Sequence, residues 1–341
     1  RIYSMSKPIT SVAALVLVED GVIGLHDPVG KWLPELADAK VLKDPAGPLD
    51  EVEDAVREIT VRDLLTHTAG LAYAFTSTGP LSEALNEAGL FGSNTRTSPD
   101  EFMKRLGALP LNHQPGTRWH YSLSDDVLGV LIERASGMRF GEFLEERIFD
   151  PLGMDDTAFW VPADKLDRLS VNYYWDPKTS ALQIADHPAK SSYAEPPAFE
   201  SGGGGLVSTA DDYARFARML AGMGQLDGVR ILSRKSVERM TRDSLTDAES
   251  GFGGLGPQAA QAFAGNGYGL GVRVQVDSGL AGTLDSPGTH GWGGAAGTWY
   301  FVDPSEDLVA VMMIQVMGGS QGGRTNLRGS FDTLVLQAID D

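Results

Sequence analysis

The N-terminal stretch contains the longest apolar run of the chain. Between Ile9 and Val18 almost every residue is apolar, which is typical of a helix buried on all sides rather than of an amphipathic helix. Pro8 has no amide hydrogen and crowds the carbonyl four residues earlier, so the helix is expected to begin near Ser4. Gly21 is a usual helix terminator. We therefore predict a buried helix that begins near Ser4 and ends before Gly21.

Capping residues mark further helices in the first half of the chain. Thr60, Ser98 and Ser124 are candidate N-caps, and Ser98 is followed by Pro99 and Glu101, as in a capping box. The long stretches between these helices are polar or lack a clear period. We expect a surface excursion at 37–58, an irregular loop that forms one wall of a pocket at 72–97, and no regular element at 155–200. The predicted helices cover residues 61–67, 98–107, 125–135 and 140–149, the last one stopping before Pro151.

The pattern changes after a glycine run at residues 202–205. No Gly-Lys-Ser/Thr closes this run, so it is not a phosphate loop, and we expect a close backbone approach to a neighbouring element or ligand. Further on, alternation with a period of two predicts strands. The expected elements are helices at 210–220 and 234–240, strands at 269–276, 298–302 and 308–316 with a tight turn at 304–307, and a helix at 327–339.

These elements predict an α+β fold. An antiparallel sheet near the C-terminus is flanked by the N- and C-terminal helices, and a mainly helical subdomain is inserted between them. We assign residues 1–29 and 201–341 to the α/β subdomain and residues 30–200 to the helical subdomain.

Composition excludes several classes of function. The formal net charge of the 341 residues is -18, which argues against nucleic acid or an anionic membrane as a partner. The absence of cysteine excludes disulfides, thiolate nucleophiles and Cys-ligated zinc. No two of the histidines are spaced i, i+4 on a predicted helix, so neither a metal site nor a cofactor is expected. The apolar run from Val12 to Val18 is too short to span a bilayer, and a cytoplasmic location is expected unless a leader preceded Arg1.

Candidate chemistry starts at the N-terminal helix. Ser4 and Lys7 lie one turn apart and therefore share a face. Lys7 could accept the hydroxyl proton of Ser4 if burial lowers the pKa of the lysine, and the helix N-terminus would help an oxyanion. Ser-x-x-Lys also occurs by chance about once in a chain of this size. A helix cap followed by a surface lysine is the competing interpretation.

Two later segments could complete a site around Ser4. Tyr121 stands just before a predicted helix, where it could share or relay the proton, although a core tyrosine with a satisfied hydroxyl is the more common fate of a buried tyrosine. The glycine-rich segment 290–295 precedes a predicted strand and is either a simple turn or a place where the amide of Ala295 joins that of Ser4 in an oxyanion hole. Ser320 fits Gly-x-Ser-x-Gly, but no histidine follows it, so it is not expected to be the nucleophile.

The ordered motifs resemble the serine β-lactamase-like superfamily, which includes class C β-lactamases, D,D-peptidases and family VIII carboxylesterases. Ser-Met-Ser-Lys-Pro at residues 4–8 resembles its Ser-x-x-Lys motif. The segments Leu-Thr-His-Thr-Ala-Gly-Leu at 65–71, Pro-Gly-Thr-Arg-Trp-His-Tyr-Ser at 115–122 and Gly-Gly-Gly-Leu-Val-Ser-Thr at 203–209 are also similar to family segments and occur in the family's order. The resemblance implies a β-lactamase/transpeptidase-like fold. It also implies two strands ahead of the serine helix, for which this sequence has no room.

The resemblance also implies residue roles. Ser4 would be the acylated nucleophile, and Lys7 with Tyr121 the proton-handling pair. The segment Trp292, Gly293 and Gly294 would replace the family's Lys-Thr-Gly strand motif, with His290 beside it and the amides of Ser4 and Ala295 as the oxyanion hole. Leu123 stands where β-lactamases carry an asparagine, and Trp292 where they carry a lysine. Both changes remove polar handles for a β-lactam.

We therefore predict a carboxylesterase that forms an acyl-enzyme on Ser4 and acts on a small-molecule ester. D,D-peptidase or D-aminopeptidase activity, weak β-lactamase activity and acyl transfer to an alcohol remain alternatives. So does a penicillin-binding-like module that only binds a ligand. The oligomeric state is left open.

Overall fold

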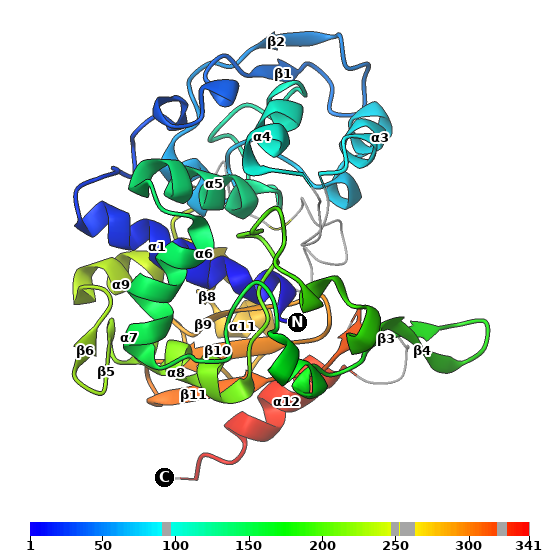
Figure 1. Ribbon diagram of the computed structural model, residues 1–341. Coiled ribbons are helices and arrows are strands. Elements are labelled where there is room, and N and C mark those ends of the chain that lie inside the picture. Colours follow the sequence, from blue (N-terminus) through cyan, green and yellow to red (C-terminus); the bar gives the residue numbers. More distant parts are fainter. Residues whose placement is uncertain (91–96, 247–251, 253–262, 319–325, 341) are drawn as a thin grey trace.

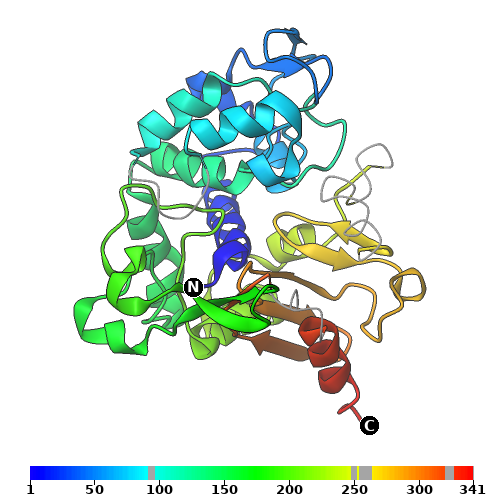
Figure 2. The ribbon, with the colours of Figure 1, turned by 90° about the vertical axis from the view of Figure 1, so that its right-hand side faces the viewer.

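The structure, a computed structural model, describes residues 1–90, 97–246, 252, 263–318 and 326–340. Helix α1 (Ser6–Glu19) lies in the middle of the molecule, between an antiparallel sheet and a block of helices (Figures 1 and 2). Its residues are buried from Ser6 through Leu17, so the predicted buried helix is confirmed. The α-helix itself begins at Ser6, because a short 3-10 turn, η1 (Tyr3–Met5), precedes it and carries Ser4.

The main sheet consists of five antiparallel strands in the order β11-β10-β9-β8-β7. Side chains alternate along β10: Trp299 and Phe301 pack with apolar residues of the C-terminal helix, whereas Tyr300 and Val302 belong to the main core. Such alternation is the physical basis of the period-two pattern. The strands are β7 (Asn266–Tyr268), β8 (Arg273–Gln275), β9 (His290–Gly293), β10 (Trp299–Asp303) and β11 (Leu308–Met312).

Two helices cover the opposite faces of this sheet (Figure 1). From α8 (Ala210–Ala221), the ring of Tyr213 lies 4.9 Å from that of Tyr300. From α12 (Leu327–Leu336), Phe331 and its apolar neighbours pack on Trp299 and Phe301. The predicted α+β architecture is confirmed. The proposed division into 1–29 with 201–341 and 30–200 stays a prediction.

The predicted caps Thr60 and Ser98 are formed, and Thr209 and Ser233 cap two later helices. Each of these four side chains accepts a hydrogen bond from a backbone amide in the first turn. Ser124 is not a cap: it is the first residue of its helix, and Leu123 occupies the N-cap position. The remaining helices are α2 (Val61–Leu65), α3 (Gly79–Glu87), α4 (Pro99–Gly107), α5 (Ser124–Ser136), α6 (Phe140–Leu144), α7 (Asp150–Leu152), α9 (Arg234–Met240) and α11 (Ser278–Ala281). In the described part of the chain, no helix combines the length and apolar character that crossing a bilayer requires.

The stretches predicted to be irregular contain regular elements. Helix α3 lies within 72–97, and the helix at 140–149 continues through a π-helical turn (Glu145–Phe149) into α7, past Pro151. The predicted strand 269–276 is shorter than expected: it contains only β8, because residues 269–272 form the turn between β7 and β8, where Gly271 has a φ of 79°. Short pairings account for the other strands: β1 (Lys40–Leu42) with β2 (Val52–Asp54), β3 (Asn172–Asp176) with β4 (Ala181–Asp186) and β12 (Val316–Met317), and β5 (Gln225–Leu226) with β6 (Val229–Arg230). The other 3-10 turns are η2 (Val29–Lys31), η3 (Pro34–Leu36), η4 (Ala74–Thr76), η6 (Ala163–Arg168), η7 (Pro188–Lys190) and η8 (Ser192–Ala194).

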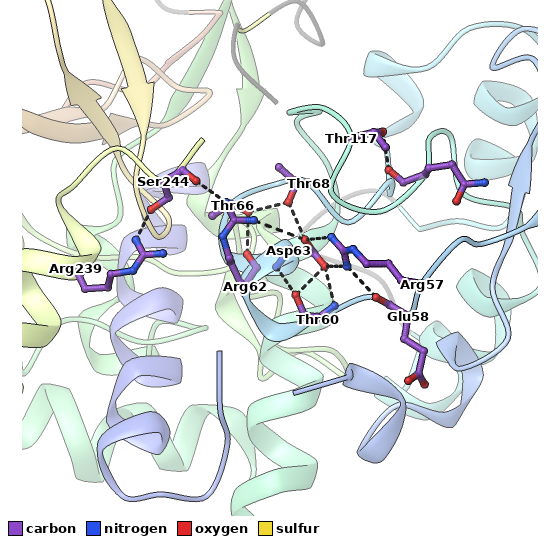
Figure 3. Close-up of polar contacts among 11 residues, drawn as sticks. Arg57, Glu58, Thr60, Arg62, Asp63, Thr66, Thr68, Thr117, Arg239 and Ser244 are labelled. Atoms are coloured by element: carbon purple, nitrogen blue, oxygen red, sulfur yellow. Dashed lines mark hydrogen bonds and ion pairs between the residues drawn. The ribbon is translucent and has the colours of Figure 1, made fainter. Parts of the chain in front are cut away.

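A buried carboxylate anchors α2, the helix that leads into the segment 65–71 (Figure 3). Asp63 accepts two hydrogen bonds from Arg57, at 2.6 and 2.9 Å, and completes a capping box with Thr60. Thr68 also donates to Asp63, at 3.1 Å. Burial by itself raises the pKa of Asp63, but the ion pair with Arg57 and the hydrogen bonds of Thr60 outweigh it and hold the pKa below its usual value. The ionised carboxylate therefore stabilises the fold.

Replacing Asp63 with alanine should lower the free energy of unfolding by about 2 to 3 kcal/mol, because a cap and a partly buried ion pair are both lost. The pKa of Asp63 is lower in the folded than in the unfolded state, so this stabilisation exists above the unfolded pKa and is lost as pH falls through the folded one. Urea unfolding at pH 7 and below about pH 4 measures both effects. If the variant were less stable than the wild type by the same amount in acid as at pH 7, the ionised carboxylate would not be the source of the stabilisation.

Candidate active site

Ser4 is exposed to a pocket by an unusual backbone turn. Tyr3, immediately before it, has a φ of 45°, in the left-handed region that non-glycine residues rarely adopt. The side chain of Asn172 donates to the hydroxyl of Tyr3 at 2.9 Å and helps to hold this turn. The predicted serine thus lies at the entry to α1, with Lys7 in the first turn of the helix.

The structure brings Ser4, Lys7 and Tyr121 together. The hydroxyl of Tyr121 lies 2.7 Å from Oγ of Ser4, and Nζ of Lys7 lies 3.4 Å from the same oxygen. Nζ also donates to the hydroxyl of Tyr73 at 3.1 Å and to the carbonyl of Gly203 at 2.5 Å. Three acceptors match the three N–H donors of an ammonium group.

The charge state of Lys7 differs from the sequence-based expectation. Lys7 is fully buried, and burial by itself lowers its pKa. The acidic groups of Tyr121, Asp125 and Asp126 and the hydrogen bond with Tyr121 outweigh burial, so the pKa of Lys7 is raised above its ordinary value. The condition for Lys7 to act as a base, a pKa lowered by burial, is therefore not met, and the ammonium form is favoured next to Ser4.

A cavity of about 450 Å³ opens at Ser4 and Tyr121. Trp292, Gly293, Gly294 and Ala295 line it, as the sequence predicts. A Cβ atom at Gly294 would lie 2.2 Å from the carbonyl oxygen of Ile2, so only glycine lets the end of β9 approach the residues before Ser4 this closely. Between described residues, no hydrogen bond is donated by the amide of Ser4 or of Ala295. Both amides therefore remain available to an oxyanion.

Two predicted substrate contacts lie outside the cavity. Leu123 is buried in the hydrophobic core rather than in the cavity wall. His290 is buried at the start of β9, where Nδ1 lies 3.1 Å from the carbonyl of Gly288, and burial lowers its pKa to about 4. Because strand side chains alternate, His290 and Trp292 share one face of β9, but only Trp292 lies far enough along the strand to reach the cavity.

Aromatic side chains form much of the wall. The ring of Trp292 lies 6.0 Å from that of Phe263, nearly parallel to it, and 5.7 Å from that of Tyr121. Phe75 also lines the cavity, is 59% exposed and stacks on Tyr73 at 4.9 Å. Tyr73 and Phe75 fall in the stretch 72–97 that the sequence predicts as a pocket wall. No motif in the sequence marks either residue.

The glycine run makes the close approach that the sequence predicts. A Cβ atom at Gly202 would lie 2.3 Å from the carbonyl oxygen of Asp125, and the carbonyl of Gly203 accepts from Lys7. Asp126 was not singled out from the sequence, although it accepts a hydrogen bond from the amide of Gly203 at 3.2 Å. Ser320 lies outside the described residues. Within the described ranges, no group of three or more His, Asp and Glu side chains could hold a metal ion.

Comparisons with known proteins fit this geometry. A family model described as "Beta-lactamase" matches residues 1–334. An uncharacterized protein of Mycobacterium tuberculosis is 44% identical, over 92% of this chain and 77% of its own length. Esterase EstB of Burkholderia gladioli is 32% identical, over 92% of this chain and 76% of its own. The solved structure of EstCE1, "a hydrolase with promiscuous acyltransferase activity", superposes with a TM-score of 0.77 at 26% identity, over 98% of this chain and 84% of EstCE1.

Proposed function

The chain belongs to the beta-lactamase family and is a serine hydrolase or acyltransferase of that family, and from this premise we propose that it hydrolyses carboxylic esters through an acyl-enzyme on Ser4. Its predicted β-lactamase/transpeptidase-like fold is confirmed by the solved structures that it matches. One observation carries the proposal. The hydroxyl of Ser4 lies within hydrogen-bonding distance of Tyr121 and Lys7 and opens into a cavity with aromatic walls.

In the proposed first step, Tyr121, as the phenolate, takes the proton of the Ser4 hydroxyl. Oγ of Ser4 forms a bond to the ester carbonyl carbon, and the carbonyl oxygen becomes an oxyanion that the amides of Ser4 and Ala295 receive. The ester C–O bond then breaks, and the leaving alcohol takes the proton from Tyr121. Lys7 remains protonated and places a positive charge beside the reacting oxygens.

In the second step, water replaces the alcohol. Tyr121 takes a proton from water, the hydroxide oxygen attacks the acyl carbon, and the bond to Oγ of Ser4 breaks as the acid leaves. Ser4 regains its proton from Tyr121. An alcohol in place of water would give acyl transfer, the activity named for EstCE1.

A substrate panel tests this proposal. The wild-type protein should hydrolyse p-nitrophenyl butyrate over many catalytic cycles. It should hydrolyse this ester far faster than a chromogenic cephalosporin or a D-Ala-D-Ala peptide. The physical reason is that Trp292 supplies no cation for the carboxylate that the last two substrates carry. Preference for either of them over the ester would refute the assignment.

The cavity wall predicts a specificity effect of Phe75. Replacing it with alanine should raise KM for p-nitrophenyl butyrate about tenfold, because apolar contact with the substrate is lost, while kcat stays within about twofold. Phe75 is largely exposed, so little stability should be lost. The acetate ester is the matched control: its short acyl group makes less apolar contact with the wall, so its KM should rise less. Equal effects on both esters would show that Phe75 does not contact the acyl chain.

A further inference from the structure

Two adjacent buried carboxyl groups lie beneath Lys7. Asp125 and Asp126 are the second and third residues of α5, with exposed fractions of 1% and 5%. Two carboxylates and one ammonium group in the same buried region leave an excess negative charge, which is costly in a low-dielectric interior. The surroundings of the two groups differ, and this difference indicates which group carries the charge.

Asp126 has the hydrogen-bond partners of an ionised carboxylate. Ser201 donates to Oδ1 at 2.5 Å, the amide of Gly203 to Oδ1 at 3.2 Å and the hydroxyl of Tyr73 to Oδ2 at 3.4 Å. Burial raises the pKa of Asp126, but Lys7 and these three donors oppose the rise, because they stabilise the charged form.

Asp125 lacks such partners. Its Oδ2 lies 3.3 Å from Nε2 of His67, and among the described residues no hydrogen bond reaches either of its carboxyl oxygens. Nδ1 of His67 contacts the hydroxyl of Ser122 at 3.2 Å. Burial raises the pKa of Asp125 to about 8 and lowers that of His67 well below its ordinary value. A neutral carboxylic acid beside a neutral imidazole fits this surrounding.

We propose that Asp126 is a positioning residue of the Ser4 site, whereas its neighbour Asp125 is neutral and dispensable at neutral pH. Asp126 acts through two groups that it holds against Lys7, the Gly203 peptide and the hydroxyl of Tyr73. It is also one of the groups whose charge favours the ammonium form of Lys7. The inference rests on the proposed function, because it assigns Asp126 a part in the same reaction.

The contacts connect Asp126 to Lys7 by two routes. The Gly203 amide donates to Asp126 while its carbonyl accepts from Lys7. Tyr73 donates to Asp126 while its oxygen accepts from Lys7, which fits the neutral phenol, because burial raises the pKa of Tyr73 well above its ordinary value. Loss of the Asp126 charge removes one of the groups that oppose the effect of burial, so the pKa of Lys7 should fall. The titratable groups around Lys7 on the neighbouring elements are His67, Tyr73, Tyr121, Asp125 and Asp126.

Three variants separate charge from shape: Asp126→Asn, Asp126→Glu and the matched control Asp125→Asn. Turnover of p-nitrophenyl butyrate is measured at pH 7, the rate of Ser4 labelling by a serine-reactive phosphonate is followed against pH, and thermal melting reports folding. Asp126→Asn should lower kcat about 100-fold, because Lys7 is misplaced. It should also move the alkaline limb of the labelling profile to lower pH by about one unit or more, because Lys7 loses its proton earlier.

The other two variants should behave differently from Asp126→Asn. Asp126→Glu keeps the charge, so the alkaline limb should stay close to that of the wild type although kcat falls. Asp125→Asn should keep kcat at pH 7 within about twofold, because the group that it replaces carries no charge there. Equal losses in both asparagine variants would overturn the proposal. So would an Asp126→Asn variant that melts earlier but keeps the wild-type limb, since its role would then be merely structural. Failure of the wild-type protein to hydrolyse the ester would instead refute the proposed function.

Discussion

Replacing Ser4 with alanine should lower ester turnover by roughly 10⁴-fold or more, because no other group can form the acyl-enzyme. The fold should survive. Ser4 lies in the short η1 turn, and its hydroxyl contacts Lys7 and Tyr121 rather than the core. Steady-state rates with p-nitrophenyl butyrate measure the loss, and thermal melting shows whether the protein remains folded.

The matched control is Ser320→Ala. Ser320 fits a nucleophile motif by sequence, but the chain has no downstream histidine to serve it. The ester turnover of Ser320→Ala should stay within about twofold of the wild-type value, as expected for a substitution away from the catalytic residues. If Ser320→Ala lost turnover and Ser4→Ala retained it, the nucleophile would be misassigned.

Replacing Tyr121 with phenylalanine should lower kcat about 10² to 10⁴-fold, the usual contribution of a positioned acid–base group. The ring is retained, so its contacts with His67, at 4.9 Å, and with Trp292 should persist. KM should change little, because the missing oxygen faces Ser4 rather than the apolar wall. Phosphonate labelling should slow in parallel, since the proton of Ser4 has no acceptor.

Tyr73→Phe is the control that separates the two hydroxyls. The hydroxyl of Tyr73 accepts from Lys7 and donates to Asp126, so its loss should cost less than about tenfold. Comparable losses in both tyrosine variants would mean that the proton moves through Lys7 and both phenols together.

The fold was predictable where residues repeat with a clear period. The apolar run through α1 and the alternation along β10 and β11 follow directly from which side chains are buried, so the sequence predicts these elements. The periodic pattern does not predict strand β9, because two of its four residues are glycine, which carries no hydrophobic signal. Helix α3 begins at Gly79-Pro80, a turn signal by sequence, and its amphipathic face becomes evident only against the core that Leu81 and Leu85 enter.

The site was predictable as far as its motifs extend. Ser4, Lys7 and Tyr121 were identified from short segments, and the structure brings them together. The direction of the Lys7 pKa shift was not predictable, because it depends on Tyr121, Asp125 and Asp126 together, and the last two come close to the lysine only through the packing of α5. Tyr73 lies 66 residues from Lys7 in the chain, in a segment without a motif. Such contacts arise only once the helices pack.

Intact-mass measurement of the acyl-enzyme tests the central claim most directly. The wild-type protein, mixed with p-nitrophenyl butyrate and quenched in acid within the first turnovers, should carry one added butyryl group. Peptide mapping should place that group on Ser4, and Ser4→Ala should carry none. Rapid ester turnover with no mass increase, or a butyryl group on any other residue, would contradict the account.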